Sequence, residues 1–468
     1  MMRKCTKLIL LGTALVFALR PSLVFSAPAK AGQFDIVGYF EKEDAWAAKA
    51  DAFVISGRAY GFHFLDAERT TAVSTMHENL SFLGIPVYEA RVYWGKEGIR
   101  RAEFSIYNKG DAGRQLDKAG FEKLVNKLGS ALNRKYGRGL NAPADKPAAN
   151  MIVRHCRWLK QSPMVQMDWA YVEPHGRGKN RREFLPEFIR VVLVPKTGMA
   201  AQDNAALTGR GMLVRAKSLR ELKMNLVKNS KGDVMIENMP MVDQGDKGYC
   251  AAASAERILR YYGLEIDQHQ VAQLAATSAS KGTSLAGISE AVSTIGKKFK
   301  LDEKALLKVE DGSSFQESQT YEDLREYNKF AKKKGAKVID WEDFATKTSA
   351  HSRTIDIQKI WGAMDPALLK EARLSHRQRF AKFRKDVKTY VDLGIPLLWS
   401  TLVGIYPEVP DLNVQGIFGH IRLIIGYNDR TGEIIYSDSW GAAHAVKRMS
   451  YEQAWAMTKG LLVLKPRM

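Results

Sequence analysis

The most informative stretch of this sequence runs from residue 243 to residue 254 and reads DQGDKGYCAAAS. Ile258, Leu259 and Tyr262 follow at helical spacing, and Gly263 then ends the pattern. A glycine-containing loop is therefore predicted to deliver Cys250 to the first turn of a short helix. Because a helix N-terminus carries a partial positive charge and unpaired amide groups, this position favours a thiolate. The thiolate is the nucleophilic form of cysteine, so Cys250 is a candidate nucleophile.

Two later blocks of the sequence supply a candidate base and a candidate carboxylate. His420 enters an apolar strand that ends near Asn428, and a short strand from Glu433 to Tyr436 leads to Asp438. A short turn joins the two strands, so His420 and Asp438 are predicted to lie at comparable heights on neighbouring strands. In that position a carboxylate can fix the imidazole tautomer and stabilise the protonated ring.

Gln244 lies six residues before the candidate nucleophile and can place an amide donor beside a developing oxyanion. Each residue alone has an ordinary interpretation: Cys250 as a small core residue, His420 as a core histidine and Asp438 as a turn residue. Their joint occurrence in this order favours a catalytic site formed by Cys250, His420, Asp438 and Gln244. His444 is a weaker competitor for the base, because it lies in a polar loop rather than at a strand.

The sequence resembles the papain-like cysteine peptidases in three blocks: QG at 244–245 with GYCA at 248–251, His420 with GY at 426–427, and DSWG at 438–441. Within that clan, the segment after the cysteine is more similar to the bacteriocin-processing (double-glycine leader) peptidase family. The resemblance covers roughly residues 234–468. It implies an α+β fold in which a cysteine-bearing helix packs on a curled antiparallel sheet, and it implies thiol peptidase activity.

The sequence also departs from these families. The double-cysteine signature around the nucleophile of papain is absent, and Asp438 stands where papain-type enzymes commonly have Asn. No transporter or ATPase segment accompanies the domain, so cleavage of double-glycine leaders is not carried over to this chain.

The rest of the chain divides by pattern into separate modules. Residues 33–195 are predicted to form an α+β module of unknown role, with a hairpin of 87–94 and 101–108 and a helix over 117–137. Residues 196–232 are expected to connect it, with a short helix, to a peptidase domain over 233–468. We expect a helical insertion near 302–364 and one long amphipathic helix over 365–394, with a basic outer face. Metal binding is not expected from the scattered histidines His63, His77, His155 and His175.

Composition and the N-terminus bear on the compartment. With 468 residues, 45% of them hydrophobic and 26% charged, and only 3 Cys, the chain is neither disordered nor a disulfide framework. A basic start, an apolar run over 8–19 and small residues near 27 predict a signal peptide over residues 1–27 and a secreted or periplasmic protein. Its removal takes away four basic residues and no acid, so the net charge falls from +20 to +16. The apolar run is too short to be a membrane anchor. No other stretch of the sequence is long and apolar enough to span a bilayer, so no stable membrane insertion is expected after cleavage.

These observations lead to an exported cysteine peptidase acting on peptides or proteins, with no cofactor. Two alternatives remain open: a transglutaminase-type acyl transferase, and a catalytically degenerate peptidase fold that binds acidic surface partners through its basic face. Nucleic-acid binding is not expected, because the chain is predicted to be exported and shows no reader motif. A disulfide between Cys156 and Cys250 is the ordinary alternative for an exported protein. The N-terminal module is interpreted as an inhibitory pro-region or as a targeting and substrate-binding domain.

Overall fold

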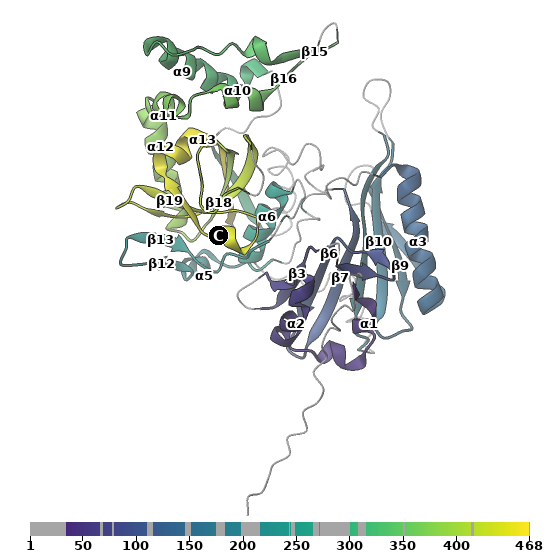
Figure 1. Cartoon of the computed structure of the whole chain (residues 1–468). Helices are drawn as coiled ribbons and strands as arrows, with labels where there is room; N and C mark the ends of the chain where they lie inside the picture. Colours follow the sequence, from purple (N-terminus) through teal and green to yellow (C-terminus); the bar gives the residue numbers. More distant parts are fainter. Residues whose placement is uncertain are drawn as a thin grey trace, which may run out of the picture.

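The computed structural model describes residues 34–65, 69–76, 79–109, 116–145, 151–174, 183–197, 216–242, 244, 249–264, 271, 300–307, 315–349, 352–412 and 416–467. The predicted signal peptide lies outside these ranges. Helices and strands are mixed in an α+β architecture with two large antiparallel sheets, one in each half of the chain (Figure 1). The α+β class predicted from the sequence is confirmed. Among the described residues, no helix combines the length and the apolar character needed to cross a bilayer.

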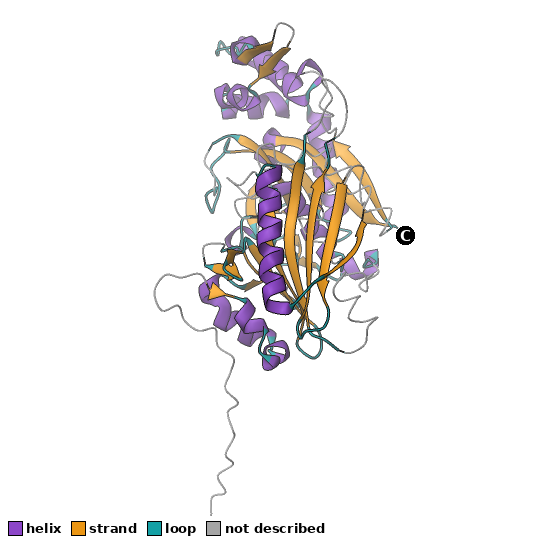
Figure 2. Ribbon diagram, turned by 90° about the vertical axis from the view of Figure 1, so that its right-hand side faces the viewer, coloured by secondary structure: helices purple, strands orange, loops and turns teal. Residues whose placement is uncertain are grey.

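The N-terminal module is built on an eight-stranded sheet. The strand order is β2 (His63–Phe64), β3 (Thr71–Ser74), β6 (Glu89–Trp94), β7 (Ile99–Asn108), β11 (Leu185–Val194), β10 (Met164–Val172), β9 (Met151–Trp158) and β8 (Leu140–Asp145). Helix α3 (Lys118–Tyr136) lies along this sheet (Figure 2). Asp117 caps it by accepting the backbone N–H of Gly120 at 2.7 Å. The predicted hairpin and the predicted helix are thus present.

Short elements complete the module at its N-terminal end. Helices α1 (Val37–Phe40) and α2 (Ala50–Gly57) pack beside a small sheet of β1 (Phe34–Asp35), β4 (Leu80–Phe82) and β5 (Ile85–Pro86). Aliphatic and aromatic side chains fill the core that these elements share with the large sheet, and Phe40 and Phe104 meet there with ring centroids 5.7 Å apart. The module therefore has a hydrophobic core of its own.

The second large sheet carries the candidate site. Its order is β12 (Leu226–Lys228), β13 (Asp233–Ile236), β18 (Phe418–Asn428), β17 (Leu397–Val403), β21 (Thr458–Pro466) and β14 (Leu301–Leu307). Strand β19 (Glu433–Ser437) pairs with β18 and leads to β20 (Lys447–Ser450). Gly426 lies where β18 meets both β13 and β19, and a Cβ there would approach Val234 O to 2.7 Å. Glycine at this position therefore lets three strands meet closely.

Helix α6 (Cys250–Tyr261) packs against β18, and so does α12 (Arg377–Val391). Four alanines in α6 are fully buried: Ala251, Ala252, Ala253 and Ala255. Their small side chains let the helix come close to the neighbouring backbone, and the Ser254 hydroxyl donates to Ile421 O of β18 at 3.1 Å. The element that begins with Cys250 is thus fixed directly to the strand that carries His420.

The region between β14 and β17 contains the predicted helical insertion. It comprises α9 (Gln319–Lys333), a hairpin of β15 (Ala345–Ser349) and β16 (Ser352–Ile355), and α10 (Ile357–Ala363). An apolar cluster joins this insertion to Leu368, Leu369 and Leu402 outside it. The prediction placed the start of this insertion near residue 302, but residues 301–307 form β14 at the edge of the main sheet. In the same way, the predicted connection over 196–232 contains helix α5 (Leu219–Lys223) and the sheet strand β12.

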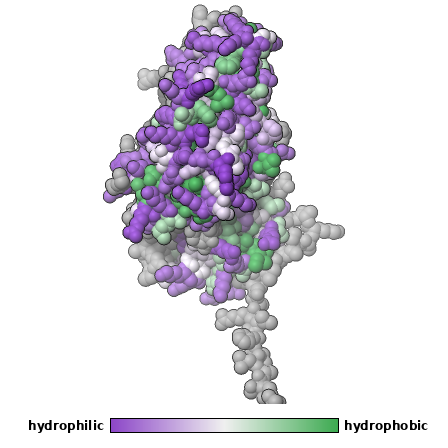
Figure 3. Space-filling view, turned by 90° about the vertical axis from the view of Figure 1, so that its left-hand side faces the viewer, coloured by the Kyte–Doolittle hydropathy of each residue, from purple (hydrophilic) through white to green (hydrophobic). Residues whose placement is uncertain are grey.

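The prediction of a single long helix over residues 365–394 is wrong. Two helices replace it, α11 (Pro366–Leu374) and α12, with Ser375 and His376 between them. Helix α11 packs on α9 and on α13 (Tyr451–Met457), whereas α12 packs on β18, so the chain must change direction. The His376 imidazole pairs with Glu326 of α9 at 2.7 Å at this break. The face of the molecule on which α11 and α12 lie is predominantly hydrophilic (Figure 3). Basic residues of α12 pair there with nearby acids such as Asp429.

Candidate active site

Cys250 is the first residue of α6 and is partly buried. Tyr249 before it has φ −106° and ψ 15° and provides no side-chain cap, so the helix begins without a polar side chain that would compete for its first amides. The position places the sulfur at the positive end of the helix dipole. Both Cys250 and Cys156 are free, so the disulfide considered as an alternative is not formed.

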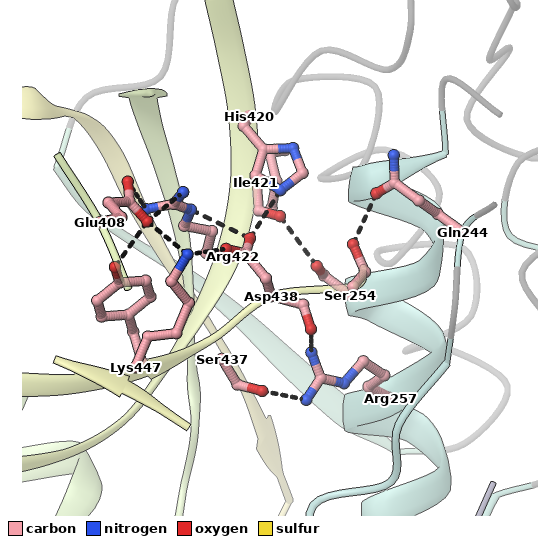
Figure 4. A network of polar contacts seen from close by, with 12 residues as sticks. Gln244, Ser254, Arg257, Glu408, His420, Ile421, Arg422, Ser437, Asp438 and Lys447 are labelled. Carbon is pink, nitrogen blue, oxygen red and sulfur yellow. Dashed lines mark hydrogen bonds and ion pairs between the residues drawn. The ribbon is translucent and has the colours of Figure 1, made fainter. Parts of the chain in front are cut away.

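His420 lies on β18, and Asp438 follows directly after β19. Because the two strands are paired, with Leu423 opposite Ser437, the carboxylate reaches the imidazole across the sheet. His420 Nε2 and Asp438 Oδ1 are 2.8 Å apart, and both side chains are buried (Figure 4). An ionised carboxylate can only accept, so Nε2 carries the proton and the other ring nitrogen, Nδ1, is left for Cys250.

Positive charges surround Asp438 on its other sides. Arg422 Nε lies 3.1 Å from Oδ1, and Lys447 Nζ lies 3.8 Å from Oδ2. Glu408 bridges these two cations, at 2.9 Å from each (Figure 4). Burial alone would raise the pKa of Asp438, but Arg422, and then the hydrogen bond and charge of His420, hold it well below its usual range. Asp438 therefore remains an anion beside the imidazole.

The cysteine and histidine perturb each other in opposite directions. Burial alone would raise the pKa of the Cys250 thiol, but a hydrogen bond with His420, the charge of His420 and backbone amides lower it overall. Burial likewise disfavours protonated His420, yet Asp438 and then Cys250 raise the pKa of the imidazole to about 8. These opposite shifts favour the thiolate and imidazolium pair over the neutral thiol and imidazole.

Trp440 covers the histidine. The indole and imidazole rings are stacked, with centroids 4.2 Å apart and planes 10° apart, and Trp440 is only 7% exposed. The stacking fixes the plane of the His420 ring and keeps water from one of its faces. His444 meets Trp440 edge to face, with centroids 5.8 Å apart, and its backbone oxygen accepts the Asp438 N–H at 3.0 Å. His420 is thus the imidazole that is paired with the carboxylate.

Gln244 is attached to the residue that follows Asp438. Its backbone N–H donates to Ser439 O at 2.9 Å, and its side-chain Oε1 accepts the Ser439 hydroxyl at 2.7 Å. Because the oxygen of the amide is used in this way, the orientation of the NH₂ group is determined as well. In Figure 4, Gln244 lies beside α6, on the same side of β18 as Ser254. The structure therefore brings all four predicted residues into one region at the start of α6.

The sequence motifs do not predict the charged residues that surround the Asp438 carboxylate. Arg422 lies two residues after His420 in an otherwise apolar strand, so a charge in that pattern was a usable signal. Arg257 of α6 is fully buried and donates to Asp438 O at 2.7 Å and to Ser437 Oγ at 2.5 Å. Glu408 and Lys447 come from remote segments, and no local pattern marks them. Within the described residues, no group of three or more His, Cys, Asp or Glu side chains is arranged to hold a metal ion.

A comparison with protein families bears on this arrangement. The model of the Peptidase_C39 like family matches residues 236–463. The C-terminal half is therefore similar to this family and is C39-like. The match confirms the resemblance to papain-like cysteine peptidases seen in the sequence, and it indicates a cysteine peptidase in general. The search of curated proteins found no match to the chain.

The two cysteines allow the charge state of the C39-like site to be measured within one protein. Burial raises the pKa of the Cys156 thiol, with partial offset from the Arg157 amide, whereas the pKa of Cys250 is lowered. At mildly acidic pH we expect iodoacetamide to alkylate Cys250 at least about tenfold faster than Cys156, because only the thiolate reacts. Peptide mass spectrometry over time measures both rates. In strong denaturant the two rates should converge, and equal rates in the native protein would contradict the expectation.

Arg422, the cation next to Asp438, should contribute to the stability of the C39-like domain. Replacing Arg422 by Met leaves Asp438 and Glu408 with fewer buried counter-charges, so we expect a loss of about 3–5 kcal/mol in the free energy of unfolding. Urea denaturation measures it. Arg379→Met is the matched control, because Arg379 is an exposed partner of Glu326 at 3.8 Å and should cost about 0–1 kcal/mol. A similar small loss for both variants would show that Asp438 does not depend on Arg422.

Proposed function

We propose that this protein is an exported cysteine peptidase that hydrolyses peptide bonds through Cys250, His420 and Asp438. The observation that carries the proposal is the buried His420–Asp438 hydrogen bond of 2.8 Å next to a cysteine at a helix start. The match to the Peptidase_C39 like family supports a cysteine peptidase in general. Export rests on the sequence of residues 1–27, and the substrate is a peptide or protein met outside the cytoplasm.

The proposed reaction begins with attack of the Cys250 thiolate on the carbonyl carbon of the scissile bond. The carbonyl oxygen becomes an oxyanion, which the Gln244 side-chain amide and the Cys250 backbone N–H stabilise. The imidazolium of His420 then gives its proton to the leaving amine as the C–N bond breaks. A thioester between Cys250 and the acyl part of the substrate remains.

Hydrolysis of the thioester completes the cycle. His420, now neutral, takes a proton from water as the water oxygen attacks the thioester carbonyl. Collapse of this second intermediate releases the carboxylic acid and restores the thiolate and the imidazolium. Throughout both halves Asp438 keeps Nε2 protonated and stabilises the charged ring, a role that requires the carboxylate to remain ionised, as its surroundings favour.

In the transglutaminase-type alternative, the acyl group of the same thioester is transferred to an amine instead of water. In the alternative of a degenerate binding protein, no thioester forms. The paired perturbation of Cys250 and His420 supports a reactive thiol over a degenerate site. Hydrolysis is the form of acyl transfer that agrees with the family match. The basic face of α12 as a contact for acidic partners is a secondary proposal that the peptidase activity does not require.

Removing the nucleophile should abolish peptide cleavage. We expect Cys250→Ala to lower kcat/KM on casein-like substrates or a peptide library by at least about a thousandfold, because covalent catalysis has no substitute in the site. Cys156→Ala is the matched control, because Cys156 lies on β9 of the N-terminal module, and it should retain wild-type activity. Unchanged cleavage by the Cys250→Ala protein would exclude this mechanism.

The pH dependence of the reaction should report the ionisation of His420. The reactive form needs protonated His420, so kcat/KM is expected to fall as pH rises through about 8, the pKa of His420. Asp438 raises that pKa, so Asp438→Asn should lower it and move the alkaline limb to lower pH. Initial rates over a pH series test both statements. An alkaline limb that stays in place or moves upward in the variant would contradict the assigned role of Asp438.

A further inference from the structure

The N-terminal module contacts the helix that carries Cys250. Arg91 on β6 forms a two-pronged ion pair with Glu256 of α6, with Nη1 to Oε1 at 2.7 Å and Nη2 to Oε2 at 3.2 Å. Glu89 holds Arg91 from the module, and Arg260 holds Glu256 from the helix at 2.6 Å. The Arg91 side chain is 3% exposed and the Glu256 side chain 0%. Charges this deeply buried require their partners, so the two modules are joined at α6.

A second contact reaches the residue next to the nucleophile. The hydroxyl of Tyr249 donates to Asn108 Oδ1, at the end of β7, and both residues are buried. Tyr249 is the N-cap residue of α6 and directly precedes Cys250. The position of the Tyr249 ring therefore influences where the backbone places the Cys250 sulfur.

A third contact lies on the segment that leads to Gln244. Leu65 O of the module accepts the backbone N–H of Met241 at 3.0 Å. Beside it, Leu65 and Val73 of the module pack with Val242 and Ala253 in a small apolar cluster of their own. The module thus contacts both segments that supply the proposed nucleophile and oxyanion donor.

Helix α6 and its N-cap residue contact the two modules through two different stripes of residues. Tyr249, Ala253, Glu256 and Arg260 recur at helical spacing and face the module. Ser254 and Arg257 lie on the adjacent stripe, about 100° away, and bind the peptidase strand and the Asp438 backbone. Helix α6 is therefore held between two sheets, and in Figure 1 it lies between β18 and the N-terminal module.

We propose that the N-terminal module is a fixed part of the peptidase that positions α6, and that Asn108 acts as a positioning residue for Cys250 through Tyr249. This inference rests on the proposed function for its link to catalysis. It differs from a removable pro-region, because the contacts fall on the buried side of the nucleophile helix and complete its charge pairing. Asn108 and Tyr249 touch no substrate in this proposal; they set the place of the backbone that carries the sulfur.

The experiment compares Asn108→Ala, Tyr249→Phe and the double variant in the full-length protein. The first readout is the rate of Cys250 alkylation by iodoacetamide across a pH series, and the second is kcat and KM on a peptide substrate. We expect each single variant to slow alkylation and to lower kcat between about tenfold and a hundredfold, with KM little changed, because small displacements of a reacting group cost rates of this size. The double variant should be no slower than the slower single variant, since both act through one hydrogen bond.

Asn133→Ala is the matched control. Asn133 accepts the backbone N–H of Gly139 at 3.0 Å and the Trp158 indole N–H at 3.2 Å within the module, on α3, so its loss should lower stability without changing Cys250 alkylation. Folded variants at Asn108 and Tyr249 with wild-type alkylation would overturn the proposal, as would additive effects in the double variant. If Asn108→Ala does not fold, Tyr249→Phe, which removes one oxygen, decides.

The two readouts separate this proposal from the proposed function. Module-dependent alkylation without any peptide cleavage would leave the positioning role standing and refute the peptidase. Normal cleavage and normal alkylation in all three variants would leave the peptidase standing and refute the positioning role.

Discussion

The buried hydrogen bond between His420 and Asp438 is the interaction on which the chemistry of this protein depends. A carboxylate without water is costly, and it is retained here because Arg422, Lys447 and the imidazole share its charge. Glu408 in turn balances the two cations. Asp438, Arg422, Lys447 and Glu408 thus form a network of paired charges beside the imidazole. In the proposed reaction the charge changes fall on the Cys250 thiol and the His420 imidazole.

The fold brings these groups together with few elements. Strand β18 presents His420 and Arg422 on one side because strand residues two apart share a face, and β19 returns the chain so that Asp438 arrives beside them. Helix α6 closes the arrangement with Cys250 at its first residue and Arg257 on the Asp438 backbone. Since α6 also pairs with Arg91, the N-terminal sheet belongs to the same mechanical unit.

Local patterns predicted much of this, and non-local packing explains what they missed. The helix after Cys250, the strand that carries His420 and the capped helix α3 all follow from periodicity, glycine positions and capping residues over short windows. The break between α11 and α12 was missed because the apolar spacing continues through it, while the two helices have different partners. Strand β14 was not predicted because it contains several charged residues, which an edge strand tolerates. Buried charges such as Glu256 and Lys447 resemble surface residues in the sequence, because their partners come from segments far away.

The proposed mechanism requires His420 to be protonated and paired with the Cys250 thiolate near neutral pH. Nuclear magnetic resonance titration of the His420 imidazole nitrogens, in the full-length protein and in Cys250→Ala, measures this state directly. We expect a pKa of about 8 for His420 in the full-length protein and a lower pKa once the thiolate is removed, because the thiolate contributes to the upward shift. A His420 pKa at or below that of an ordinary histidine, unchanged by the substitution, would contradict it.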